Sequence, residues 1–353
     1  MGIPIKRDGF IKGSAASLFA GALDIAAVRT ARATGGLDVW PDPGTVGPAQ
    51  MRILICADRG AEVPQLADGG IFTFASKRWR GTPSIVALPG GKSGVVAAVD
   101  VDDYLYGVLP IEASPGWPPE ALAAQAIVAR TFALSRRNLA RPYDLVVSQN
   151  DQRFGGIEAE FPATNAAVDA TRNTVVTFAG ENASVFYSSC CGGHTADAAT
   201  IWGHSALPYL RGVADPYCVA APDYRWQRSV ALERVQAALA ARVPGEITGF
   251  TLGPADSGGR PLSIDVLTRD GPTTLSASDF RAAIGAEIVR SPWIQALQLA
   301  PPQVNIQGAG RGHGVGFCQW GARALGAAGS TAATILAFYF PGTRIAAVDA
   351  GER

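Results

Sequence analysis

The chain has 353 residues, of which 48% are hydrophobic and 17% are charged, so it is long enough to bury a full core in two domains or in one elaborated domain. Its 30 basic and 30 acidic residues cancel, and no Lys/Arg-rich run could follow a phosphate backbone, so we expect no nucleic-acid partner. The 41 glycines and 24 prolines favour turns and short strands over long helices. After the N-terminal segment no charge-free apolar run reaches about 18 residues, which predicts no membrane-spanning helix.

Residues 1–34 are similar to an export signal. Basic residues precede a moderately apolar stretch at 13–28 that is rich in small side chains. Two acidic residues depart from the pattern: Asp8 stands where a twin-arginine signal has its second arginine, and Asp24 interrupts the apolar stretch. We predict an exported protein that faces the periplasm or the cell wall, with the amphipathic N-terminal helix of a cytosolic protein as the alternative. Residues 35–50 contain Gly and Pro clusters and are expected to form a linker.

From residue 51 the hydrophobic residues of the sequence recur at regular spacings. Alternation and β-branched side chains predict strands over 51–57, 70–76 and 93–102, which we expect to be antiparallel neighbours in one sheet. Two prolines then suit a helix start, and apolar side chains at helical spacing predict a helix over 119–138.

Glu112 is a lone carboxylate, which we expect in the Pro/Gly/Trp-rich loop before this helix. The N-terminus of the helix would stabilise the anion of Glu112. A general acid instead needs a raised pKa, which an apolar wall formed by Trp117 or Tyr106 could supply. A solvated loop glutamate without catalytic function is the alternative interpretation.

Six motifs carry a family resemblance. In chain order they are YLYGVLPIEASPGWPPEALAAQAIVARTFAL, DQRFGGI, VFYSSCCGGHT, IWG, PYLRGVADPYC and GRGHGVGFCQWGARALGAAGSTAATILAFYFPGT. The set covers roughly 51–343 and resembles the stage II sporulation protein D family, together with the amidase-enhancer proteins called LytB. The resemblance implies action on peptidoglycan, with Glu112 as the catalytic residue and Arg130 at a position important for activity; a structural ion pair is the alternative for Arg130. Family members commonly continue with Met-Pro after the glutamate, where this chain has EASPGWP.

The sporulation members of that family are similar to lytic transglycosylases, for which one acid is sufficient. A glycoside hydrolase normally uses two carboxylates, whereas a lytic transglycosylase uses one glutamate as acid and then as base toward the C6 hydroxyl of muramic acid, which closes a 1,6-anhydro ring. Asp151 and Gln152, on a Gly-flanked loop, are candidates for sugar binding, with a plain turn as the alternative. Arg311 and His313 of the Gly-dense motif at 310–322 are candidates to line the site, and a hydrogen bond that holds the loop is the alternative for His313.

The cysteines predict a structural zinc site. The segment CCGGHT places Cys190, Cys191 and His194 within reach of one cation, and Cys218 and Cys318 could complete a tetrahedral set. The resemblance also implies a zinc site with a cysteine and the histidine of this motif in some family members. The alternatives are a disulfide, first between Cys191 and Cys218, which would be natural in an exported protein, and free thiols.

Residues 223–294 differ in character from their surroundings and predict an inserted α+β subdomain, whose second helix begins at a Ser/Asp start near Ser276. We expect 51–222 and 295–343 to form the catalytic core, with a mixed, mainly antiparallel sheet and helices, and thus an α+β fold.

Two functions remain in competition. The first is glycan-strand cleavage in cell-wall remodelling or sporulation, and the second is non-catalytic wall binding that enhances an N-acetylmuramoyl-L-alanine amidase. The presence of Glu112 favours the first.

Overall fold

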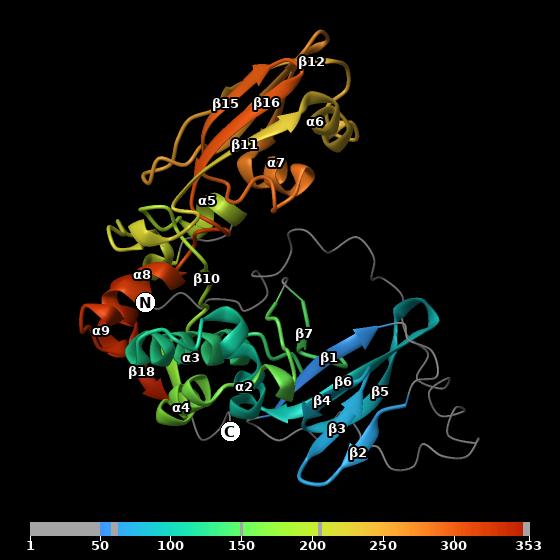
Figure 1. Cartoon of the computed structure of the whole chain (residues 1–353), viewed down its shortest axis with the longest axis vertical. Coiled ribbons are helices and arrows are strands. Elements are labelled where there is room, and N and C mark those ends of the chain that lie inside the picture. Colours follow the sequence, from blue (N-terminus) through green and yellow to red (C-terminus); the bar gives the residue numbers. More distant parts are fainter. Residues whose placement is uncertain (1–49, 58–62, 149–150, 204–206, 349–353) are drawn as a thin grey trace, which may run out of the picture. The chain divides into compact units, whose positions relative to one another are not determined.

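The computed structural model describes four stretches of the chain, which are residues 50–57, 63–148, 151–203 and 207–348. Internal contacts divide the chain into two units (Figure 1). The first unit runs to Ser184 and takes up the chain again from Arg344, and the second comprises Val185–Thr343. Helices and mainly antiparallel sheets in both units confirm the α+β fold. The predicted export signal at 1–34 lies outside the described residues, as does the predicted linker apart from its last residue. Within the described stretches, no helix has the length and apolarity that a membrane span requires.

The first unit contains three sheets. Its strands are β1 Gln50–Ala57, β2 Gln65–Ala67, β3 Ile71–Phe74, β4 Lys77–Arg80, β5 Thr82–Leu88, β6 Lys92–Asp100, β7 Leu145–Val146, β8 Thr174–Phe178, β9 Glu181–Asn182 and β18 Arg344–Ala347. The largest sheet has the order β5-β6-β1-β7, with antiparallel pairs except for the parallel β1–β7 pair. The other two have the orders β2-β3-β4 and β18-β8-β9.

The predicted strands are confirmed at β1, β3 and β6, but the expectation of one common sheet is wrong for β3. The chain reverses at Ala75 and Ser76, both at positive φ (52° and 59°), and continues as β4. Two successive residues with positive φ match the twist of a tight hairpin. The pattern at 70–76 therefore contained a turn that alternation alone does not reveal.

Three helices of the first unit, α2 (Val101–Glu112), α3 (Pro119–Leu134) and α4 (Pro162–Ala170), pack on one another (Figure 1). Helix α2 was not predicted. It begins where the strand over 93–102 was expected to continue, because the Asp100 side chain accepts a hydrogen bond from the backbone N–H of Asp102 (2.9 Å) and caps the helix. Helix α3 confirms the predicted start and ends four residues early.

A buried ion pair joins these helices. Arg130 of α3 is fully buried, and its guanidinium lies 2.6 Å from the carboxylate of Asp102 on α2. The same guanidinium donates to the backbone carbonyls of Val168 (3.2 Å) on α4 and Thr174 (3.0 Å) on β8. Burial lowers the pKa of Arg130, and the charge of Asp102 opposes that shift. One side chain thus connects three helices and a strand.

The second unit has short strands and helices at both ends of its sequence and an α+β region with its own hydrophobic core between them. Its strands are β10 Tyr187–Ser188, β11 Arg225–Ala231, β12 Ile247–Leu252, β13 Ser263–Thr268, β14 Gly271–Ser276, β15 Ile294–Ala300, β16 Gln303–Ala309 and β17 Phe317–Cys318. Its helices are α5 Ala198–Trp202, α6 Leu232–Leu239, α7 Ala277–Ile284, α8 Gln319–Ala327 and α9 Ala332–Tyr339. The sheets are β11-β16-β15, β12-β13-β14 and the parallel pair β10-β17.

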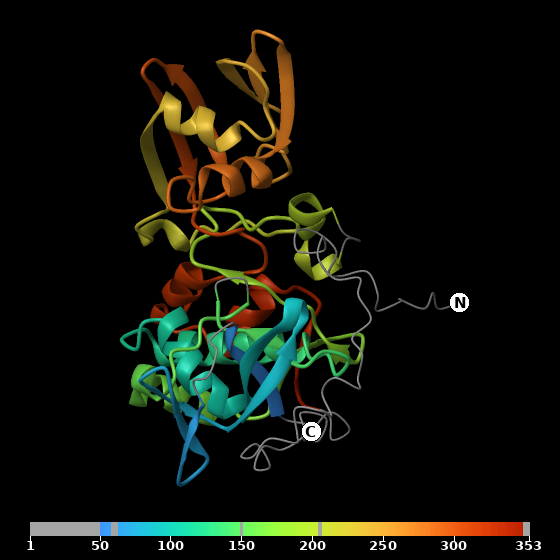
Figure 2. The ribbon, with the colours of Figure 1, turned by 90° about the vertical axis from the view of Figure 1, so that its right-hand side faces the viewer.

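One hydrophobic core extends from Trp226 to Ile306 within this unit. Helices α6 and α7 lie side by side against its strands (Figure 2). The Ser276 side chain accepts a hydrogen bond from the N–H of Asp279 (2.9 Å), which confirms the predicted cap of α7. This core contains most of the insertion predicted at 223–294 and adds β15 and β16, whose register with β11 makes them part of the same sheet.

Loss of the Asp102 charge is expected to weaken the fold strongly. In Asp102→Asn the buried Arg130 guanidinium loses its counter-charge, so the free energy of unfolding should fall by about 3 kcal/mol or more. Urea denaturation followed by circular dichroism measures the change. The control is Glu158→Gln, which removes the charge from the half-exposed pair with Arg78 and should cost about 1 kcal/mol or less. Equal losses in the two variants would contradict the role given to the buried pair.

Candidate functional site

Glu112 is the last residue of α2 and is half-buried. This corrects the expectation of a loop position, since the loop comprises only residues 113–118 before α3. The helix continues through Pro110, and the N–H of Ala113 still donates to the carbonyl of Leu109 (2.9 Å). Proline in a helix interior ordinarily removes a hydrogen bond and kinks the helix, yet α2 continues past Pro110 to Glu112. The carboxylate therefore sits at the end of a rigid element.

The motif DQRFGG packs directly on the same helix. The N–H of Gly155 donates to the carbonyl of Gly107 on α2 (3.0 Å). A side chain at Gly107 would come within 2.6 Å of the Phe154 ring, and one at Gly155 within 2.8 Å of Ile111, so both glycines are needed for this approach. Ile111, next to Glu112, remains 40% exposed. Our sequence analysis missed Gly107 and Phe154 as supports of the site.

The two predicted sugar-binding residues of this motif have structural contacts. The Asp151 carboxylate accepts a hydrogen bond from the N–H of Val146 (2.9 Å), and this residue stays half-buried. Gln152 is fully buried, and its side chain donates to the carbonyl of Ala129 on α3 (3.3 Å). Of the two, Asp151 is the one whose side chain retains exposure to solvent.

Arg130 lies in the helical core, so the ion-pair alternative considered for it is observed. Its partner Asp102 is ten residues before Glu112 on α2, which corresponds to about 15 Å along a helix axis. Arg130 consequently fixes the N-terminal turn of the helix whose last residue is Glu112.

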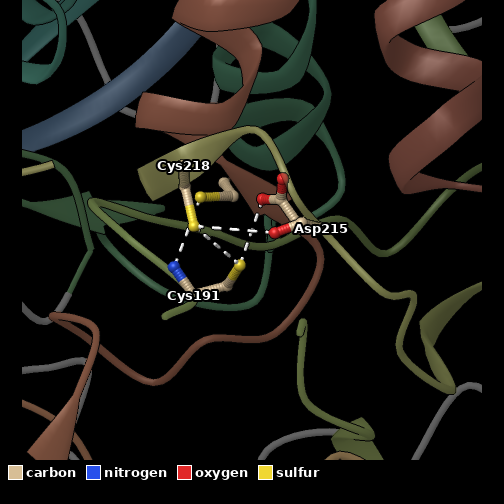
Figure 3. A group of neighbouring side chains, drawn as sticks. Cys191, Asp215 and Cys218 are labelled. Carbon is tan, nitrogen blue, oxygen red and sulfur yellow. Dashed lines mark hydrogen bonds between the residues drawn. The ribbon is translucent and has the colours of Figure 1, made fainter. Parts of the chain in front are cut away.

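A second candidate site lies in the second unit, where three cysteines and an aspartate converge (Figure 3). The possible ligand atoms of Cys191, Asp215, Cys218 and Cys318 all lie within 4.8 Å of one another, and all four residues are buried. The Sγ of Cys191 is 3.1 Å from the Asp215 carboxylate and 3.6 Å from the Sγ of Cys218. We call this group the thiol–carboxylate cluster.

The cluster differs from the predicted ligand set at three positions, Asp215, His194 and Cys190. Asp215 takes part although it was not predicted, whereas the imidazole Nδ1 of His194 lies 2.7 Å from the carbonyl of Thr195 and is not among the converging atoms of the described residues. Cys190 lies beside the cluster, with its Sγ 4.0 Å from the carbonyl of Cys218. All five cysteines of the chain are free, including the pair first expected to form a disulfide.

Segments distant in sequence build the cluster through backbone contacts. Cys190 and Arg311 exchange two backbone hydrogen bonds (3.1 and 2.8 Å), which place the CCGGHT segment beside the Gly-rich segment. The N–H of Cys191 points at the Sγ of Cys318 (3.2 Å), directly before α8. The N–H of Asp215 donates to the carbonyl of Gly193 (2.9 Å). Three chain segments therefore meet at one point.

Burial and mutual hydrogen bonds set the protonation of the cluster. Burial raises the pKa of Cys191, Cys318 and Asp215, because each charged form would lose its hydration. A hydrogen bond with Cys218 raises the pKa of Cys190 to about 12. Hydrogen bonds from the neighbouring thiols lower the pKa of Cys218.

Two separations within the cluster are close to those of a tetrahedral zinc site. Zn–S bonds of about 2.3 Å and a Zn–O bond of about 2.0 Å give S···S edges of about 3.8 Å and S···O edges of about 3.5 Å. The observed separations of 3.6 and 3.1 Å from Cys191 are close to these values. Three soft sulfur donors and one carboxylate are ligands that zinc accepts.

Arg311 and His313 lie on the Gly-rich segment of the second unit. The Arg311 guanidinium pairs with Asp223 (3.2 Å) and Glu287 (3.4 Å). The Nδ1 of His313 accepts a hydrogen bond from the N–H of Val315 (3.0 Å), which is the loop-holding contact considered from the sequence. The His313 ring also stands 5.2 Å from the half-buried Trp202 ring, so these two side chains form an aromatic pair on the unit.

The chain was compared with known proteins. A family profile described as "Stage II sporulation protein" matches residues 90–178, the part that contains Glu112 and Arg130. An uncharacterised protein of Brachyspira hyodysenteriae is 33% identical over 71% of this chain and 68% of its own length. The stage II sporulation protein D of Bacillus subtilis is 26% identical over 72% of this chain and 77% of its own length. An amidase enhancer of Bacillus subtilis is also 26% identical, over 68% of this chain but only 40% of its own length.

Gly321 of α8 is predicted to be essential for the cluster. Replacing a helical glycine by alanine ordinarily stabilises a protein by about 0.5–1 kcal/mol. Here a Cβ would collide with the Tyr339 hydroxyl and the Asp215 carboxylate, which are hydrogen-bonded to each other (3.0 Å). Gly321→Ala should therefore lower the free energy of unfolding by about 1–3 kcal/mol, as measured by urea denaturation.

Gly116→Ala is the control for this measurement. A Cβ at Gly116 would meet no atom closer than 4.0 Å, so the variant should stay within about 0.5 kcal/mol of the wild type. Stabilisation by Gly321→Ala would contradict the tight packing of α8 on the cluster.

Proposed function

Because the chain belongs to the stage II sporulation protein D family, we propose that it cleaves the glycan strands of peptidoglycan as a lytic transglycosylase in cell-wall remodelling or sporulation. The position of Glu112 carries this proposal: it is a half-buried carboxylate at the end of α2, within the region matched by the family profile. Glu112 can act as a general acid in the form that carries its proton.

The reaction uses one carboxyl group twice. Glu112 donates its proton to the glycosidic oxygen while the bond from that oxygen to C1 of the muramic residue breaks. The oxygen of the muramic C6 hydroxyl then forms a bond to C1, and its proton returns to Glu112. The products are a shortened strand and a 1,6-anhydro end, and no water is consumed.

Supporting residues hold this acid in place. The ion pair of Arg130 with Asp102 fixes the start of α2, and the contact of Gly155 with Gly107 fixes its last turns. Arg130 is a positioning residue in this mechanism because its guanidinium is buried and engaged. Asp151 is the remaining candidate for sugar binding from the same motif. In the second unit, His313 with Trp202 offers a ring surface on which a sugar could stack.

A structural zinc ion is the second part of the proposal. The geometry supports Cys191, Cys218, Cys318 and Asp215 as ligands, with His194 outside the set. A bound zinc supplies a rigid link among three chain segments, since four protein ligands leave no open position for chemistry. Cys190 would remain a neighbouring thiol.

An amidase-enhancing role is the alternative function, and the similarity to an amidase enhancer supports it. In that case the chain binds the cell wall without cutting it, and a cell-wall amidase is its partner. Both functions require an exported, wall-facing protein, which fits the basic and apolar pattern at the start of the sequence.

Glu112→Gln is expected to abolish glycan cleavage while leaving the fold intact. An amide of the same shape cannot deliver a proton, so the rate should fall by about 100-fold or more. The assay digests glycan strands that lack stem peptides and analyses the products by mass spectrometry. The matched control is Glu120→Gln, which changes an exposed glutamate in the first turn of α3 and should retain activity.

The products separate the alternatives in the same assay. Anhydro ends, lighter by one water than hydrolytic ends, support the transglycosylase reaction. Reducing ends alone would indicate a hydrolase with a second carboxylate, for which Asp151 is the first candidate. No cleavage by the wild type, together with faster release of stem peptides by an added amidase, would support the enhancer role.

Zinc binding should follow the observed cluster. Protein purified without chelator is expected to carry one zinc ion, with all thiols reactive after denaturation. Asp215→Ala removes a ligand and should lower the zinc content, whereas His194→Ala should retain it. Metal analysis by plasma emission measures both variants. Zinc loss in His194→Ala with full retention in Asp215→Ala would contradict the ligand assignment.

A further inference from the structure

Arg260 is a buried cation in the loop between β12 and β13. The residue is 2% exposed. A turn at Asp256 holds the backbone of Arg260 in place. The Asp256 carboxylate accepts hydrogen bonds from the N–H groups of Gly258 (2.9 Å) and Arg260 (2.8 Å). This loop belongs to the region in which the sequence analysis identified no chemistry, and the segment DSGGR resembles an ordinary surface turn.

The Arg260 guanidinium reaches the segments that form the thiol–carboxylate cluster. Its NH2 group donates to the carbonyls of Cys191 (2.8 Å) and His194. The guanidinium carbon lies 4.4 Å from the centre of the Trp293 ring, in a cation–π contact. A Cβ at Gly314, which has φ of 77°, would come within 3.0 Å of the same group, so the Gly-rich segment is shaped around it.

No carboxylate of the described residues lies within ion-pairing distance of this guanidinium, in contrast to Arg130 with Asp102. Its NH1 atom is buried and has no hydrogen-bond partner. A buried charge is costly unless another charge compensates it.

We propose that Arg260 is the counter-charge of the metal centre, and that it favours the zinc-loaded cluster over the thiol or disulfide forms. This inference rests on the proposed zinc site. Three thiolates and one carboxylate carry four negative charges, of which zinc neutralises two, so the loaded centre is anionic. Neutral thiols or a disulfide would leave the buried guanidinium without that compensation. Arg260 is a positioning residue, since its guanidinium donates to the backbone carbonyls of Cys191 and His194 rather than to a ligand side chain.

The inference gives the inserted layer a function. The β12–β13 loop extends from the separate hydrophobic core of the second unit. It places the positive charge of Arg260 beside the thiol–carboxylate cluster, which other chain segments form. Occupancy of the metal centre is thereby coupled to the order of this loop and of the Gly-rich segment around Gly314.

The test measures zinc affinity by competition with a chromophoric chelator for the full chain and three variants. Arg260→Gln should lose about 10- to 100-fold in zinc affinity, the range for loss of a group that supports metal ligands. Arg260→Lys keeps the charge and should lose less than Arg260→Gln. The matched control is Arg281→Gln, since Arg281 also donates to a backbone carbonyl, that of Val289 (3.0 Å), within the inserted layer. This control should bind zinc like the wild type.

Substitution of Co²⁺ for zinc provides a second readout. The sulfur-to-cobalt absorption bands should keep their positions in Arg260→Gln, because the ligands are unchanged while the affinity falls. A Lys variant that loses as much affinity as the Gln variant would overturn the counter-charge role, as would an Arg260→Gln protein that binds zinc like the wild type. If Arg260→Gln does not fold, the Arg260→Lys protein gives the test. A folded Arg260→Lys protein that loses more than about tenfold in zinc affinity would also overturn the counter-charge role of Arg260. Failure of the wild type to bind zinc would instead refute the proposed metal site itself.

Discussion

The second unit depends on bringing three sulfur atoms and a carboxylate to one buried point. Cys191, Cys218 and Cys318 come from segments up to 127 residues apart, and their backbones must approach closely for the side chains to meet. Glycines permit this approach, since Gly321 leaves room for the Asp215 carboxylate and Gly314 leaves room for Arg260. Without a cation, desolvation keeps most of these groups protonated. The proposed metal ion would convert the same crowding into a rigid link among three chain segments.

The first unit holds one carboxyl group, that of Glu112, at the end of helix α2. The Arg130–Asp102 pair anchors the start of α2 in the core, and the FGG turn packs on its last turns through Gly107. Glu112 is therefore held by a supported element, as the proposed catalytic acid requires. Removing Arg130 would disturb the helix that carries Glu112, because the Arg130 guanidinium is the buried partner of Asp102.

Part of the fold and part of the cysteine cluster could be predicted from the sequence. The α+β fold, the start of α3, the Ser276 cap and the convergence of Cys191, Cys218 and Cys318 were all accessible from patterning and cysteine spacing. Asp215 was missed because an aspartate before Pro and Tyr is typical of a turn, although its position three residues before Cys218 was a usable signal.

Other features depended on tertiary contacts. His194 was expected to bind metal, but its ring lies beside Gly258 of a loop more than 60 residues away, a contact that no spacing rule reveals. Glu112 was expected in a loop because the segment around it is rich in Pro, Gly and Trp, whereas α2 continues through Pro110 and ends at Glu112 itself. Zinc K-edge X-ray absorption on the purified full-length protein tests the metal centre most directly. The account predicts three sulfur scatterers at about 2.3 Å and one oxygen at about 2.0 Å from zinc. A first shell with a histidine nitrogen in place of sulfur, or protein without zinc whose cysteines are joined at the disulfide distance of about 2.05 Å, would contradict it.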